Sequence, residues 1–112
     1  MKKIILVLFL LFVFVTPVRA ESNSVILSKG TVIESDYLKA GETVLIEGEI
    51  KGDAFLAGAV VTVNGPVDGD LFVFGGKVSV NGPVNNNIRI FGGDVSINGP
   101  VGRNVLLVGG NL

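Results

Sequence analysis

The stretch VNGPVDGDLFVFGGKVS, residues 63–79, is followed directly by two near copies of itself, VNGPVNNNIRIFGGDVS at 80–96 and INGPVGRNVLLVGGNL at 97–112. The copies lie 17 residues apart without insertions, and the same interval extends back to about Thr31. Three columns of this alignment hold only aliphatic residues, a fourth holds only Gly, and a fifth holds only Asp or Asn, namely Asp36, Asp53, Asp70, Asn87 and Asn104. A constant period of this length predicts stacked, structurally equivalent units.

Each unit has the pattern of short β-strands. Residues 78–80 alternate apolar, polar, apolar, and residues 71–74 form a short aliphatic and aromatic run between Asp70 and a pair of glycines. No window shows a helical period. We therefore expect an all-β fold, a single-stranded parallel β-helix (β-solenoid) of four to five rungs, in which one repeat with two or three short strands forms each rung.

The corners of the rungs are expected where Gly and Pro recur. Glycine adopts positive φ without steric penalty, and proline suits positions that need no backbone donor. The column of Asn64, Asn81 and Asn98 is expected to stack its amides outside these corners. The predicted corner residues are Gly65, Pro66, Gly82, Pro83, Gly99 and Pro100.

One outer face of the predicted solenoid is apolar. If Leu71 and Val73 point inward, their neighbours point outward, and the equivalent outward positions in adjacent rungs are mostly aromatic or aliphatic. Two interpretations remain open: the stretch Val25-Ile26-Leu27 covers this face, or the face is a lateral interaction surface. The residues of this predicted interaction surface are Phe55, Phe72, Phe74, Phe91, Leu106 and Val108.

A motif G-x-[IV]-x-[GN]-[DN] recurs at residues 48–53 and 65–70 and, in weaker form, at 82–87 and 99–104. With these repeats the sequence resembles the bactofilin, or polymer-forming cytoskeletal, family over residues 36–112. The resemblance implies a right-handed, roughly triangular β-helix that polymerises end to end without nucleotide. The cytoskeletal members of that family lie in the cytoplasm, whereas this chain has a predicted signal peptide and is more similar to the exported relatives.

Residues 1–20 have the three parts of a signal peptide. Lys2 and Lys3 precede an apolar run at residues 4–15, Pro17 ends it, and small or aliphatic residues lead to a predicted cleavage site after Ala20. The alternative is an uncleaved N-terminal anchor. The predicted location is therefore periplasmic, cell-surface or membrane-associated. Residues 21–30 are expected to form a linker or cap strand, and residues 31–112 the solenoid.

Composition excludes several classes of site. The 112 residues suffice for one small domain and contain no Cys, His or Trp. Disulfides, His or Cys metal sites and histidine-dependent triads are therefore absent. Loss of the three basic residues of the signal peptide changes the formal net charge from −1 to −4, which argues against nucleic-acid binding. The carboxylate pair considered for acid/base chemistry, Asp68 and Asp70, is interpreted as corner residues.

The C-terminal residues Asn111-Leu112 align with Asp94-Val95, at the start of a strand in the preceding copy. The repeat therefore stops inside a rung. We expect either that the sequence is a fragment of a longer protein or that another subunit completes the open rung.

These observations predict a non-enzymatic, exported scaffold domain without a cofactor, which associates with itself end to end or laterally, at the cell envelope or with a membrane partner. Two other functions remain open. One is a carbohydrate-binding or carbohydrate-acting solenoid that uses the aromatic residues, with any catalysis from Asp68 and Asp70. The other is a passive extracytoplasmic domain of a larger membrane protein.

Overall fold

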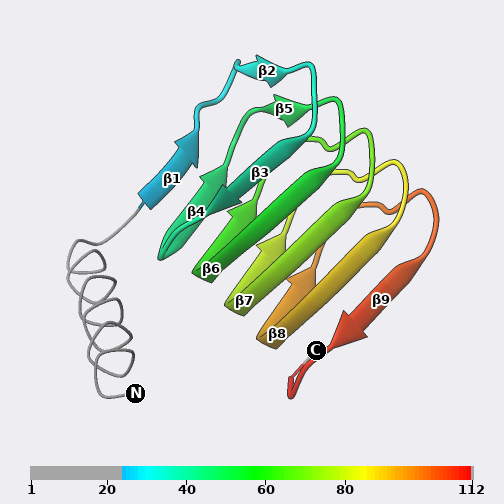
Figure 1. The fold of residues 1–112 in the computed structure, drawn as a ribbon. Coiled ribbons are helices and arrows are strands. Elements are labelled where there is room, and N and C mark those ends of the chain that lie inside the picture. The colour runs from blue at the N-terminus through cyan, green and yellow to red at the C-terminus, as the bar shows by residue number, and fades with distance from the viewer. Residues whose placement is uncertain (1–23, 112) are drawn as a thin grey trace, which may run out of the picture.

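The computed structural model describes residues 24–111, and within this range it contains β-strands and no helix. The strands are β1 (Ser24–Leu27), β2 (Val32–Ile33), β3 (Tyr37–Ala40), β4 (Thr43–Ile46), β5 (Glu49–Ile50), β6 (Ala54–Val63), β7 (Leu71–Val80), β8 (Ile88–Ile97) and β9 (Val105–Val108). Figure 1 shows the strands stacked rung upon rung along one axis. The predicted signal peptide with its cleavage site at Ala20 lies outside the described residues.

All strand pairs are parallel, and the sequence repeat sets their register from β2 onward. The main sheet has the order β1-β4-β6-β7-β8-β9, with β3 also paired to β6. A second face is formed by β2, β5 and a series of single bridges that joins Ile50 to Val67, Val67 to Val84, and Val84 to Val101. The predicted β-solenoid is therefore confirmed.

Each of β6, β7 and β8 is one continuous strand of ten residues. We expected two short strands here, with the glycine pair between them. Instead Gly75 lies inside β7 and pairs with Gly58 and Gly92 in the adjacent rungs. Leu71 and Val73 are buried before this glycine, and Val78 and Val80 after it, so the alternation shifts phase there. The strand thus bends at the glycine pair, where Gly76 is the one position without a partner in the ladder, and its two halves face the core from different sides.

The core consists of aliphatic ladders that run along the solenoid axis. Val44, Val61, Val78 and Val95 form one ladder, and each side chain is almost or completely inaccessible to solvent. No polar side chain is buried within residues 24–111. Burial of each aliphatic side chain contributes about 1.5–3 kcal/mol before the entropic cost of ordering the chain is subtracted.

The glycines of the rungs have a different role from the predicted one. Only Gly30 has a positive φ among the described residues, so left-handed backbone does not explain the others. A Cβ at Gly75 would lie 2.8 Å from the carbonyl oxygen of Gly58, and one at Gly92 2.7 Å from that of Gly75. At these two positions glycine is required because the backbones of successive rungs approach each other too closely for a side chain.

The predicted corner residues lie between the end of one long strand and the next bridge. Here the carbonyl oxygen of Pro66 accepts a hydrogen bond from the Ile50 N–H at 3.0 Å, and Pro83 and Pro100 accept in the same way from Val67 and Val84. Proline fits because its oxygen maintains the contact between rungs although it has no N–H to donate.

The strand β1 extends the stack before the predicted start of the repeat. It pairs with β4, Ser24 to Thr43, at an offset two residues longer than the repeat, because the turn from Ser28 to Thr31 has two additional residues. Gly30 adopts its positive φ of 90° in this turn. The residues Val25-Ile26-Leu27 therefore pair edge to edge in the stack and do not cover the aromatic positions of β6 and β7, so this interpretation is wrong.

Candidate interaction surface

The outward side chains of β3, β9 and the first halves of β6, β7 and β8 form one surface, which we call the aromatic face. It has two columns along the solenoid axis, set by the parallel register. The first column is Leu38, Phe55, Phe72, Arg89 and Leu106. The second column is Ala40, Ala57, Phe74, Phe91 and Val108.

Rings of adjacent rungs stack within each column. Phe55 and Phe72 have ring centroids 4.7 Å apart and planes within 4° of each other, and Phe74 and Phe91 have centroids 5.1 Å apart and planes within 8°. The guanidinium carbon of Arg89 lies 5.3 Å from the Phe72 ring centroid, within cation–π range. Because the ring planes face one another along the column, they direct mainly their edges toward solvent.

The aromatic face is exposed among the described residues. The exposed fraction is 56% for Phe74, 38% for Phe55 and 40% for Phe91, and Leu38 reaches 66%. The inward neighbours Leu71 and Val73 are completely buried. Strand alternation, which follows from the sequence, therefore separates the aromatic face from the core.

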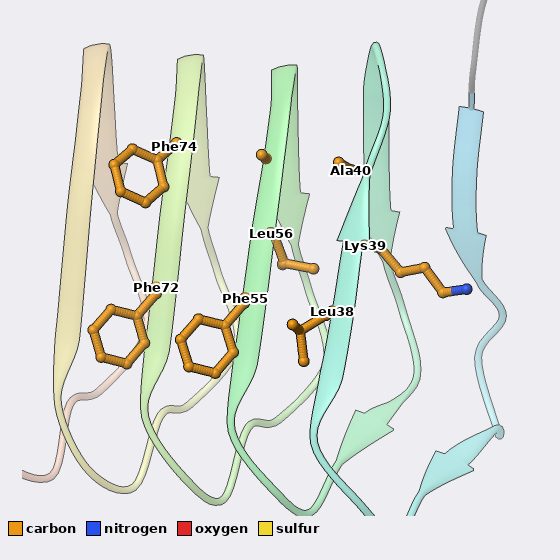
Figure 2. A pocket seen from close by; sticks show the side chains of 8 residues that line it. Leu38, Lys39, Ala40, Phe55, Leu56, Phe72 and Phe74 are labelled. Carbon is orange, nitrogen blue, oxygen red and sulfur yellow. The ribbon is translucent and has the colours of Figure 1, made fainter.

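A shallow apolar hollow lies at the end of the face nearer the N-terminus. Its lining residues are Leu38, Lys39, Ala40, Phe55, Leu56, Ala57, Phe72 and Phe74. The hollow exists because the second column, which carries rings at Phe74 and Phe91, carries only methyl groups at Ala40 and Ala57. Figure 2 shows Phe55, Phe72 and Phe74 around this space and the Lys39 chain directed away from it. The Phe74 ring consequently has no aromatic neighbour on the side of Ala57.

The six predicted surface residues all belong to the aromatic face, but the prediction omitted Leu38 and Ala40. Leu38 is the most exposed large apolar residue of the face, and Ala40 forms part of the hollow. Both could have been found by counting one repeat back from Phe55 and Ala57.

A ladder of side-chain amides runs outside one corner, as predicted from the Asn column. The Nδ2 of Asn81 donates to Oδ1 of Asn64 at 2.7 Å, and the Nδ2 of Asn98 donates to Oδ1 of Asn81 at 2.8 Å. The ladder begins at Glu47, whose carboxylate accepts from Asn64 Nδ2 at 2.7 Å. These exposed residues therefore link successive rungs and have a structural role.

The Asp and Asn column forms a second ladder, from side chain to backbone. An Oδ1 oxygen of each residue except Asn104 accepts the backbone N–H of its equivalent one rung later, for example Asp53 from Asp70 at 2.8 Å and Asp70 from Asn87 at 3.0 Å. Asp68 makes a longer contact of 3.4 Å with the Asn85 amide. Asp70, one of the two acidic residues considered for catalysis, is therefore engaged in holding the rungs together.

The two ends of the stack differ in one interior column. This column contains Lys39, Leu56, Val73, Ile90 and Leu107 in successive rungs. At the first position, Lys39 is exposed, and its ammonium lies 5.8 Å from the Tyr37 ring. At the last position, Leu107 is half-buried, and Val105 beside it is 46% exposed. A charge thus lies at one end of the core, and aliphatic side chains lie at the other.

Comparison with protein-family models, with curated proteins and with solved structures gave no match. The resemblance to the bactofilin family thus stays a prediction. Within residues 24–111, no helix has the length and apolar character needed to span a membrane. The same part of the chain contains no group of three or more acidic side chains placed to hold a metal ion.

Proposed function

We propose that the protein is a non-enzymatic, exported scaffold that associates with itself at the cell envelope through the open edge of its terminal rung. The observation that carries this proposal is that β9 has an unpaired edge beside exposed core side chains. Among the described residues β9 pairs with β8 alone, and the core side chains Val105 and Leu107 are partly exposed beside it. An unpaired parallel edge offers backbone donors and acceptors to another strand.

In this proposal a strand of a second copy adds to β9 and covers the exposed end of the core. The backbone pairs supply the register, and Val105 and Leu107 supply apolar contact. Export is supported by the basic, apolar and small-residue segments within residues 1–20. In this proposal the contact is made by backbone groups and aliphatic side chains, and no catalytic group takes part in it.

The substitution Leu107→Lys tests the end contact. It places at the C-terminal end the residue type that Lys39 provides at the other end of the same column, and an inward-pointing charge on an edge strand opposes strand addition. We expect the wild-type chain to self-associate in sedimentation velocity and negative-stain microscopy, and the variant to lose this association. The matched control is Ser96→Lys, which adds the same charge at an exposed outward position of β8.

A wild-type protein that remains a monodisperse monomer at high concentration would contradict the proposal. Assembly by Leu107→Lys to the same extent as wild type would contradict the role of the β9 edge. Export is tested separately by N-terminal sequencing of the protein recovered outside the cytoplasm, which we expect to begin at Glu21.

A further inference from the structure

We infer that the aromatic face is a lateral docking surface for a second copy of this chain, which lies antiparallel to the first so that the rings of one copy enter the hollow of the other. This inference uses a different surface from the β9 edge and does not rest on the end contact. The two copies are related by a two-fold axis that runs along the strand direction, between the rungs of Ala57 and Phe74.

The order of side chains in the second column carries the inference. Along the axis this column reads small, small, large, large, from Ala40 and Ala57 to Phe74 and Phe91. A two-fold rotation about the strand direction reverses the solenoid axis of the second copy. It places Phe74 opposite Ala57 of the second copy, and Phe91 opposite Ala40. Both hollows are then filled by rings, because this column, when it faces itself, is complementary only in the antiparallel sense.

The same axis also fixes the partners in the first column. Phe55 of one copy lies opposite Phe72 of the other, and Arg89 lies opposite Leu38. The rung of Leu38 contains both Asp36 and Lys39, and both are exposed. Charge therefore does not distinguish this arrangement from others, and the second column is the part of the face that selects it.

The exposed area is sufficient for a pair. Aromatic side chains have about 150–250 Å² each, and the exposed fractions of the eight face residues in the four paired rungs amount to roughly 600 Å² per copy. A pair would remove about 1,200 Å² of surface from solvent, which is at the lower limit of specific interfaces. An exposed apolar patch of this size on one chain usually marks a contact.

A carbohydrate is less well matched to the same hollow. Sugars dock on open aromatic faces and need hydrogen-bonding partners, whereas the stacked rings direct mainly edges outward. The seven lining residues other than Lys39 have apolar side chains, and Lys39 is directed away. The hollow has the size and chemistry to receive phenyl rings such as those that the face itself presents.

A residue exchange tests the arrangement, and Leu107→Lys is kept in every protein so that the end contact does not contribute. The dissociation constant of the pair is measured by sedimentation equilibrium on the full chain. We expect Ala57→Phe to weaken pairing about tenfold or more, because the new ring occupies the hollow and opposes Phe74. Phe74→Ala is expected to weaken pairing as well, because the inserted ring is lost.

The double variant Ala57→Phe with Phe74→Ala is the decisive protein. In the antiparallel arrangement its new ring again lies opposite a methyl group, so we expect the dissociation constant to return to within about threefold of the parent value. Ser96→Phe, which adds an exposed ring to the other half of β8, is the control and should change nothing. Circular dichroism melting verifies that each variant is folded.

A parent protein that stays monomeric would overturn the inference, whatever else occupies the hollow. So would a double variant at least as weak as the weaker single variant, because that result indicates another geometry. The two proposals fail separately, since lateral pairing responds to residues 57 and 74 and end-to-end assembly responds to residue 107.

Discussion

At the residue scale, the chain is held together by side chains that reach one rung along the axis. The Asp and Asn column shows why these two residue types are interchangeable there. Asp70 and Asn87 both present an Oδ1 oxygen to the backbone N–H of the next rung, at 3.0 and 3.2 Å. The position requires an acceptor at that distance from the backbone, and it does not require a charge.

The substitution Asp70→Ala removes this acceptor and leaves the partly buried N–H of Asn87 without its partner. We expect a loss of about 1–3 kcal/mol in the free energy of unfolding, measured by denaturant titration. Asp70→Asn retains the oxygen, as Asn87 does one rung later, and should cost less than about 0.5 kcal/mol. Equal losses in the two variants would show that the charge, and not the acceptor, matters.

At the element scale, the corners between strands are limited by contact between backbones. Gly82 lies after β7, and a Cβ at this position would be 2.7 Å from the carbonyl oxygen of Asn64 and closer still to that of Gly65. Both obstacles are backbone atoms of the preceding rung, so relief requires a shift of the rung itself. Such a shift would separate the paired strands on either side of the corner.

We therefore expect Gly82→Ala to lower the free energy of unfolding by about 1–3 kcal/mol, as overpacking of an interior does. Gly110→Ala is the matched control, because the nearest atom to a Cβ there is 3.8 Å away and the φ is not positive. Its effect should stay within about 0.5 kcal/mol. The measurement is thermal or denaturant unfolding of both variants, and a Gly82→Ala protein as stable as the control would contradict the close approach.

At the scale of the whole molecule, the solenoid is a one-dimensional stack in which each rung contacts only its neighbours. The strand β7 has a paired strand on both sides along both of its halves, whereas β9 pairs on one side with β8. The exposed fraction of the core side chains increases from the central strand to the end, from zero at Val73 in β7 to 46% at Val105 in β9. Stability should therefore be greatest in the central rungs and decline toward the ends.

Amide hydrogen exchange tests this gradient. In the Leu107→Lys protein, which we expect not to assemble end to end, peptides from β7 should exchange at least about tenfold more slowly than peptides from β9, a difference of about 1.4 kcal/mol in local opening. In the wild-type protein at high concentration, β9 should gain protection if a second copy pairs with it. Uniform protection over β7 and β9 in the variant would contradict a stack that opens from its end.

The sequence by itself determined the architecture, because a repeat of constant length without insertions allows identical residues to lie over one another and form ladders. Strand alternation also assigned Leu71 and Val73 to the core and Phe72 and Phe74 to the outside. The Asn ladder followed from the same reasoning. These features depend on neighbours along the chain or one period away, which a linear pattern records.

Only the tertiary structure decided the features that depend on distances between rungs. It showed that most glycines permit close backbone contact and do not adopt positive φ, and that β1 joins the stack at an offset longer than the repeat. It also showed that stacked rings leave a hollow over Ala40 and Ala57. The physical reason is that contact distances, ring orientation and strand register arise from packing in three dimensions, whereas the repeat specifies only which residues share a column.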